Sequence, residues 1–130
     1  LHLFDTFEGI PVSGDYDMEH VVGDFANTSL NDVVKSIPDA VFHVGVFPAT
    51  MPSAIGPVAF VHVDCDQYEP ATAAIDMLFP LMVMGGVMLF DDYAATSGVT
   101  KAVDDRFTAM EIRRTGRGKA YVTKESPDAR

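Results

Sequence analysis

The sequence predicts an α/β fold built on a mostly parallel sheet. Two continuous apolar runs, residues 58–64 and 87–91, each end in aspartate, and a helix-like stretch over residues 69–82 separates them. The order strand, helix, strand is typical of a βαβ unit, in which the two strands are parallel. Apolar runs without a polar alternation are also typical of parallel sheets, whose strands are covered on both faces.

The first part of the chain predicts two strands, one helix and a long loop. Residues 1–5 are short, apolar and end in an acid, which favours a strand. Residues 12–27 are rich in turn formers and have little periodicity, so they predict a loop. Residues 28–37 begin with a hydroxyl N-cap candidate and space their apolar side chains as one helix face. Residues 41–46 then predict a second strand.

The second part predicts the remaining elements. We expect residues 58–64 to form a strand buried on both faces, and Gly85-Gly86 to form a turn that precedes the strand over residues 87–91. An apolar stripe predicts a helix over residues 99–110. Two short segments within residues 112–123 flank Gly-Arg-Gly, which predicts an antiparallel hairpin at the carboxyl end of the fold.

Composition restricts the compartment and the partners. The chain has 130 residues, 48% of them hydrophobic, which predicts a single domain over residues 1–130. A net charge of −10 argues against nucleic acid and anionic membrane surfaces as partners. The longest apolar run, residues 77–90, is interrupted by Pro80 and by two glycines, so no membrane span is expected. Cys65 is the only cysteine, which favours a reducing, cytoplasmic setting.

Four aspartates follow the two strands of the βαβ unit. Asp64 and Asp66 come at the end of the first strand, and Asp91 and Asp92 at the end of the second. Because neighbouring parallel strands end at the same sheet edge, we expect these carboxylates to converge. Crowded carboxylates repel one another, and a hard divalent cation relieves that repulsion. We therefore predict that Asp64, Asp91 and Asp92 bind Mg²⁺, and that Asp66 is free to accept a proton as general base.

Other polar residues have simpler interpretations. Asp64 and Asp66 are expected to point the same way, because side chains alternate along a strand. His62, on the strand before Asp64, is interpreted as a core histidine. Lys119 belongs to a small basic hairpin that we expect to face solvent. Asp5 ends an early strand, where an acid either binds a ribose or caps a loop.

Taken together, these residues resemble the metal-dependent macrocin O-methyltransferase family of class I S-adenosylmethionine (AdoMet) methyltransferases. The resemblance rests on four segments that together span nearly the whole chain: Phe4-Asp5-Thr6-Phe7-Glu8-Gly9-Ile10-Pro11, His62-Val63-Asp64-Cys65-Asp66-Gln67-Tyr68-Glu69, Gly85-Gly86-Val87-Met88-Leu89-Phe90-Asp91-Asp92-Tyr93 and Ala102-Val103-Asp104-Asp105-Arg106-Phe107.

The resemblance implies a Rossmann-like sheet and a set of site residues. It implies that Asp64, Asp91 and Asp92 hold Mg²⁺ and that Asp66 is the general base. It further implies cofactor contacts, with Asp5 on the AdoMet ribose and with Gly45 and Phe47 bordering the adenine. Family members methylate hydroxyl groups of sugars on antibiotics and related natural products, so the expected partner is a small molecule with a vicinal diol.

The chain departs from the family pattern in one respect. The family's first strand and its glycine-rich turn, which approach the methionine part of AdoMet, have no counterpart in this sequence. In the family that strand lies between the strands predicted over residues 1–5 and 58–64. We therefore expect either direct pairing of those two strands or a second copy of the chain filling the gap as a homo-oligomer. AdoMet affinity should be low in both cases.

Two alternatives stay open at the level of the sequence. Asp64-Cys65-Asp66 is an Asp-x-Asp motif that could join a metal ion to a nucleotide sugar in a glycosyltransferase, although no lysine or arginine for a diphosphate lies nearby. The second alternative is a non-catalytic remnant of an enzyme that keeps the fold and the cation site.

Overall fold

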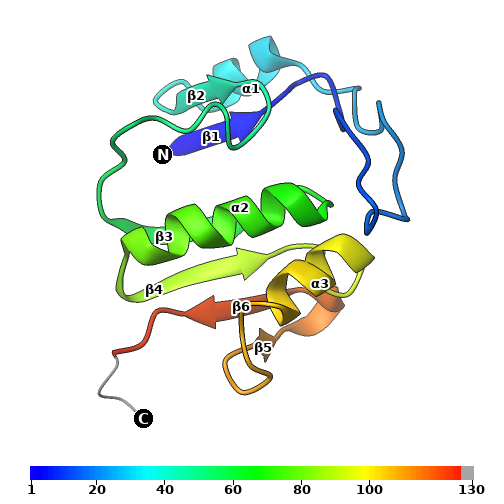
Figure 1. Ribbon diagram of the computed structural model, residues 1–130. Helices are drawn as coiled ribbons and strands as arrows, with labels where there is room; N and C mark the ends of the chain where they lie inside the picture. The colour runs from blue at the N-terminus through cyan, green and yellow to red at the C-terminus, as the bar shows by residue number, and fades with distance from the viewer. Residues whose placement is uncertain (127–130) are drawn as a thin grey trace. The chain divides into compact units, whose positions relative to one another are not determined.

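The computed structural model describes residues 1–126, which fall into two compact units (Figure 1). One unit combines residues 1–13 with residues 20–53, and the other combines residues 14–19 with the chain from Ala54 onward. The expectation of a single domain stays a prediction.

The first unit contains a two-stranded parallel sheet. Strand β1, His2–Asp5, pairs with β2, Val41–Val44, in a register that runs from His2 opposite Val41 to Asp5 opposite Val44. Helix α1, Leu30–Ser36, connects them. It ends at the expected place, because the residue before Pro38 is disfavoured in the helical region and has a φ of −136° here. The two strands and the helix were predicted, and the parallel pairing agrees with the mostly parallel sheet expected of the fold.

The second unit is a four-stranded sheet with two helices. Its strands lie in the order β3-β4-β6-β5, with β3 and β4 parallel and the two later neighbours antiparallel. The bounds are β3 Val58–Val63, α2 Tyr68–Leu78, β4 Met82–Phe90, α3 Ser97–Asp104, β5 Arg113–Arg114 and β6 Ala120–Thr123. The βαβ unit and the antiparallel hairpin are therefore confirmed.

The core of this unit lies between one face of the sheet and the two helices. Figure 1 shows α2 and α3 on the same side of β3, β4 and β6. Alternate side chains on the strands are buried on that side, as are the apolar faces of both helices. The buried apolar residues of this unit are Val63, Ala71, Ala74, Ile75, Leu78, Met82, Met88, Phe90, Tyr93, Val99, Ala102, Val103, Ala120 and Val122.

The expectation that the strand over residues 58–64 is covered on both faces is wrong. Val63 is buried, but Phe60 is 58% exposed and His62 is also exposed. The helices of this unit cover one face of the sheet only, so alternate side chains of β3 point away from them. An apolar run alone does not reveal this, because the run combines side chains of both faces.

Two further boundaries differ from the predictions. Gly85-Gly86 lies inside β4 rather than before it, with Gly85 at a φ of +80° and a register shift in the pairing with β3. Such an irregularity is typical of a bulge that needs glycine. Helix α3 ends at Asp104, whereas we expected it to continue to Met110, which is 82% exposed.

Direct pairing of the strands over residues 1–5 and 58–64 is not found. The strands within residues 1–126 form two separate sheets, with β1 bonded to β2 and β3 bonded to β4. None of the helices in this part of the chain is long and apolar enough for a membrane crossing.

Residues 14–19, expected as part of a long loop, cap both helices of the second unit. The buried carboxylate of Asp17 accepts hydrogen bonds from the backbone N–H of Tyr68 at 2.7 Å and of Gly14 at 3.0 Å. Glu19 accepts one from the N–H of Ser97 at 3.1 Å. Tyr68 begins α2 and Ser97 begins α3, so one loop satisfies free N–H groups at the amino ends of two helices.

Candidate metal centre

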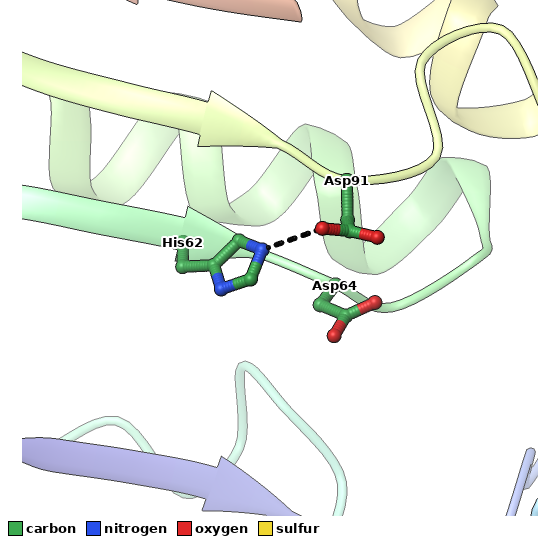
Figure 2. A group of neighbouring side chains, drawn as sticks. All are labelled: His62, Asp64 and Asp91. Atoms are coloured by element: carbon green, nitrogen blue, oxygen red, sulfur yellow. Dashed lines mark hydrogen bonds and ion pairs between the residues drawn. The ribbon is translucent and has the colours of Figure 1, made fainter. Parts of the chain in front are cut away.

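The pairing of β3 with β4 brings Asp64 next to Asp91. The parallel register places Val63 opposite Phe90, and each aspartate follows directly. The backbone N–H of Asp91 donates to the carbonyl of Val63 at 3.0 Å, which extends the pairing by one more step. Figure 2 shows both carboxylates at this end of the strands, beside the ring of His62.

His62 belongs to this cluster. One ligand atom each from His62, Asp64 and Asp91 lies within 4.8 Å of the other two. Nε2 of His62 is hydrogen-bonded to Oδ1 of Asp91 at 3.0 Å, and the side chain of His62 is 43% exposed (Figure 2). The interpretation of His62 as a core residue is therefore wrong. Its neighbour Val63 is buried on the face that the helices cover, so the side chain of His62 emerges on the opposite face.

Asp92 lies half-buried among the other aspartates. Burial, followed by the charges of Asp66, Asp64 and Asp91, raises the pKa of the Asp92 carboxyl to about 7. Its Oδ2 is buried and has no hydrogen-bond partner among the described residues. A buried carboxylate oxygen without a partner is costly, so the position favours a proton or a cation.

Asp91 has the opposite environment. The hydrogen bond from Lys119, and after it the one from His62, lowers the pKa of the Asp91 carboxyl. Lys119 forms an ion pair with Oδ1 of Asp91. The expectation that Lys119 faces solvent is wrong, because β6 pairs antiparallel with β4 and places Ala120 opposite Phe90. The next step of that register sets Lys119 against Asp91.

Asp66 approaches the cluster by a different route from the one expected. Strand β3 ends at Val63, and Asp66 has a φ of +58°, so the strand alternation that would align it with Asp64 does not apply. Its charge is nevertheless the largest of those that raise the pKa of Asp92. Its role as general base stays a prediction.

Cys65 is not a candidate nucleophile. Burial raises the pKa of its thiol to about 12, and Sγ lies 3.7 Å from the carbonyl of Gln67, to which it donates. The reactive form of cysteine is the thiolate, which such a pKa suppresses near neutral pH. The chemistry of this edge therefore belongs to oxygen and nitrogen donors.

The residues expected at the cofactor lie in the first unit. Oδ1 of Asp5 accepts a hydrogen bond from the N–H of Phe7 at 2.7 Å. At least one carboxylate oxygen of Asp5 therefore caps the following loop. The N–H of Gly45, at a φ of +132°, donates to the carbonyl of Asp5 at 2.9 Å. Phe47 packs edge-on against Phe4. Asp5 and Gly45 are thus adjacent, and the cofactor roles of all three predicted residues stay predictions.

The donor set in the second unit fits a divalent cation. One oxygen each of Asp64 and Asp91 and one imidazole nitrogen of His62 lie within 4.8 Å of one another, and a buried oxygen of Asp92 has no hydrogen-bond partner among the described residues. Hard divalent cations take carboxylate oxygens, and transition metals also take imidazole. The ion pair of Lys119 with Asp91 partly neutralises the negative charge of this cluster and therefore opposes cation binding.

Comparisons with known proteins agree with this architecture. A family model described as macrocin-O-methyltransferase (TylF) matches residues 1–115. The chain belongs to this family. Solved structures share the fold: the O-methyltransferase NovP superposes with a TM-score of 0.79 and 22% identity, covering 96% of this chain and 60% of NovP. Calicheamicin methyltransferase CalS11 has a TM-score of 0.75 and 22% identity, covering 94% of this chain and 59% of CalS11.

Two curated relatives show similarity at the sequence level. An "8-demethyl-8-(2,3-dimethoxy-alpha-L-rhamnosyl)-tetracenomycin-C 4'-O-methyltransferase" from Streptomyces olivaceus is 32% identical over 111 residues, which cover 69% of this chain and 40% of the relative. A demethyldecarbamoylnovobiocin O-methyltransferase from Streptomyces niveus is 30% identical over 129 residues, covering 83% of this chain and 47% of the relative. The chain therefore spans less than half the length of these two relatives.

Proposed function

We propose that this chain is the cation-binding part of a metal-dependent O-methyltransferase that transfers a methyl group from AdoMet to a hydroxyl of a sugar or a related natural-product diol. The observation that supports it most is the convergence of Asp64 and Asp91 with His62 at one sheet edge, in a chain of this family. Asp92 is not one of these three residues, but it lies close enough for the charges of Asp64 and Asp91 to raise the pKa of its carboxyl, and its buried Oδ2 has no hydrogen-bond partner among the described residues.

Each predicted site residue has a role in this proposal. Asp64, Asp91 and Asp92 would hold Mg²⁺, and a bound Mg²⁺ lowers the pKa of an alcohol that coordinates it. Asp66 would accept the proton of the acceptor hydroxyl, and AdoMet, when bound, would supply the methyl group for that oxygen. Asp5 is assigned to the ribose of AdoMet, and Gly45 and Phe47 to its adenine.

The names of the relatives indicate the acceptor class. The relative from Streptomyces olivaceus is named for a rhamnosyl natural product, and the relative from Streptomyces niveus for a novobiocin precursor. We infer that the acceptor is a sugar-bearing small molecule with two neighbouring oxygens, because an ion held by three carboxylates has positions left for such a pair. Holding the two oxygens in place would supply much of the catalysis by positioning.

Calorimetric titration with AdoMet, in the presence and absence of Mg²⁺, tests the proposal. We expect weak AdoMet binding that becomes tighter when Mg²⁺ and a rhamnose-type diol are present. Binding of a nucleotide sugar in place of AdoMet would instead support the glycosyltransferase alternative. Uptake of Mg²⁺ with no AdoMet binding up to millimolar concentration would contradict the transferase assignment for this chain and favour a non-catalytic remnant.

A further inference from the structure

We propose that His62 is an additional ligand of the cation, so that the site has a mixed nitrogen and oxygen donor set and prefers transition-metal ions such as Mn²⁺, Co²⁺ or Zn²⁺ to Mg²⁺. This inference rests on the cation site of the proposed function. It goes beyond that proposal, which assigns the ion to aspartates alone.

The direction of the His62 side chain is set by β3. Residues of this strand alternate between the face that packs on α2, where Val63 is buried, and the opposite face. His62 and Asp64 are two residues apart, so the strand geometry favours placing both on that opposite face. No rearrangement of the backbone is needed to bring the imidazole to the ion, because Figure 2 shows the ring already beside both carboxylates.

The distances match those of ligands around a single ion. With metal–ligand bonds of about 2.1 Å, adjacent ligands in an octahedron lie about 3.0 Å apart and opposite ligands about 4.2 Å apart. Nε2 of His62 lies 3.0 Å from Oδ1 of Asp91. The three candidate atoms of His62, Asp64 and Asp91 lie within 4.8 Å of one another. Small side-chain rotations would therefore complete the geometry.

The chemistry of the donor atoms explains the expected preference. Mg²⁺ takes oxygen ligands and retains water, and it gains little from an imidazole. Mn²⁺, Co²⁺ and Zn²⁺ bind neutral imidazole nitrogen well, and the affinity of such a site is generally lowest for Mn²⁺. Coordination through Nε2 requires the ring proton on Nδ1, and in Figure 2 the ring turns its Nε2 toward Asp91.

Metal titrations of the wild-type chain and two histidine variants test this inference. His62→Gln removes the imidazole and keeps a polar side chain. His43→Gln is the matched control, because His43 stacks on Phe4 in the first unit and is not among the residues of the cluster. We expect His62→Gln to weaken Co²⁺ and Zn²⁺ binding by about 10–100-fold and Mg²⁺ binding by less than about 3-fold. His43→Gln should change neither.

Pulsed electron paramagnetic resonance of bound Mn²⁺ supplies an independent readout. We expect nitrogen modulation from one imidazole in the wild type and in His43→Gln, and its loss in His62→Gln. An equal loss of affinity for Mg²⁺ and Co²⁺, without nitrogen modulation in the wild type, would overturn the inference and make His62 a positioning residue for Asp91.

Failure of this inference and failure of the proposed function give different results. Binding of Co²⁺ that is lost in Asp92→Asn but unchanged in His62→Gln would overturn the role of His62 and leave the aspartate site standing. The absence of any cation binding to the folded wild-type chain would overturn both. Circular dichroism verifies that each variant is folded, which is expected because His62 is exposed.

Discussion

Asp91 and Asp92 are neighbours in sequence but have opposite electrostatic environments. Lys119 and His62 contact Asp91 and lower the pKa of its carboxyl. Asp92 is partly buried beside three other carboxylates, which raises its pKa to about 7. Near neutral pH, Asp91 is therefore ionised, whereas Asp92 is divided between its protonated and ionised forms unless a cation binds.

Asp92→Asn should make the metal-free protein more stable at alkaline pH. Folding raises the pKa of this carboxyl from 3.8 to about 7, so the folded state binds the proton more tightly than the unfolded state does. The contribution of Asp92 to the free energy of unfolding is therefore fully present below pH 3.8 and is lost as the pH rises to about 7. Asparagine stays neutral throughout. We expect Asp92→Asn to increase the free energy of unfolding by about 1–2 kcal/mol at pH 8. This increase is smaller than the free energy that corresponds to the whole pKa shift, because Asp92 is partly solvated.

Urea unfolding at pH 8 and pH 4 in the presence of a chelator measures this difference. The gain should shrink markedly at pH 4, where Asp92 is protonated in the folded state. An equal effect of Asp92→Asn at both pH values would contradict the assignment of the raised pKa to Asp92.

Lys119 should weaken cation binding. Its ammonium pairs with Oδ1 of Asp91, so an arriving cation must compete with it and experiences its positive charge. We expect Lys119→Met to tighten Mg²⁺ binding by about 3–10-fold, as measured by calorimetry. Lys35→Met is the control, because Lys35 is 77% exposed on α1, and it should have no effect. Weaker binding in Lys119→Met would show that Lys119 supports the site instead.

At the scale of elements, the loop of residues 14–19 holds the amino ends of α2 and α3. Asp17 is buried and accepts hydrogen bonds from Tyr68 and Gly14. Gly98 of α3 packs so closely on this carboxylate that a Cβ there would lie 2.2 Å from Oδ1 of Asp17. Glycine at position 98 is therefore required for the carboxylate of Asp17 to pack against α3.

Asp17→Ala should destabilise the second unit by about 1–3 kcal/mol, because it removes the acceptor of the N–H groups of Tyr68, at the start of α2, and of Gly14 in the loop. Asp15→Ala, at an exposed position of the same loop, should change the free energy of unfolding by less than about 0.5 kcal/mol. Thermal and urea unfolding measure both. Equal effects of the two substitutions would show that the cap contributes nothing specific.

The elements could largely be predicted from the sequence, because their signals are local. The apolar run before Asp64, the helical spacing after Gln67 and the Gly-Arg-Gly turn each predict an element, and their order predicts the parallel pairing of β3 with β4. Helix ends were less predictable. Helix α3 ends at Asp104, although the apolar spacing continues to Met110. The spacing did not predict this end, because it does not indicate which apolar side chains are buried.

The site was predictable only in part. Convergence of Asp64 with Asp91 follows from parallel strands, but His62 was placed in the core because a histidine between valines gives no sign of which face it occupies. Its even spacing from Asp64 was the available signal. Lys119 and Asp17 depend on the register of β6 and on the path of a loop, which no local pattern specifies.

At the scale of the whole molecule, the predicted cofactor and cation residues belong to different units. Asp5, Gly45 and Phe47 lie in the first unit, whereas the aspartate cluster lies entirely in the second. The chain also spans less than half the length of its curated relatives. The proposed cation site uses only side chains of the second unit, so it is the part of the proposal that this chain can test most directly.

Calorimetric titration of Mg²⁺ at pH 8 into the wild type, Asp92→Asn and Asp32→Asn tests the central claim. Asp32 is 77% exposed on α1 and provides a control of equal charge change. We predict one Mg²⁺ per chain, at least tenfold weaker binding in Asp92→Asn, and wild-type binding in Asp32→Asn. Wild-type affinity in Asp92→Asn, or no saturable Mg²⁺ binding to the folded wild type, would contradict the claim that these aspartates share one ion.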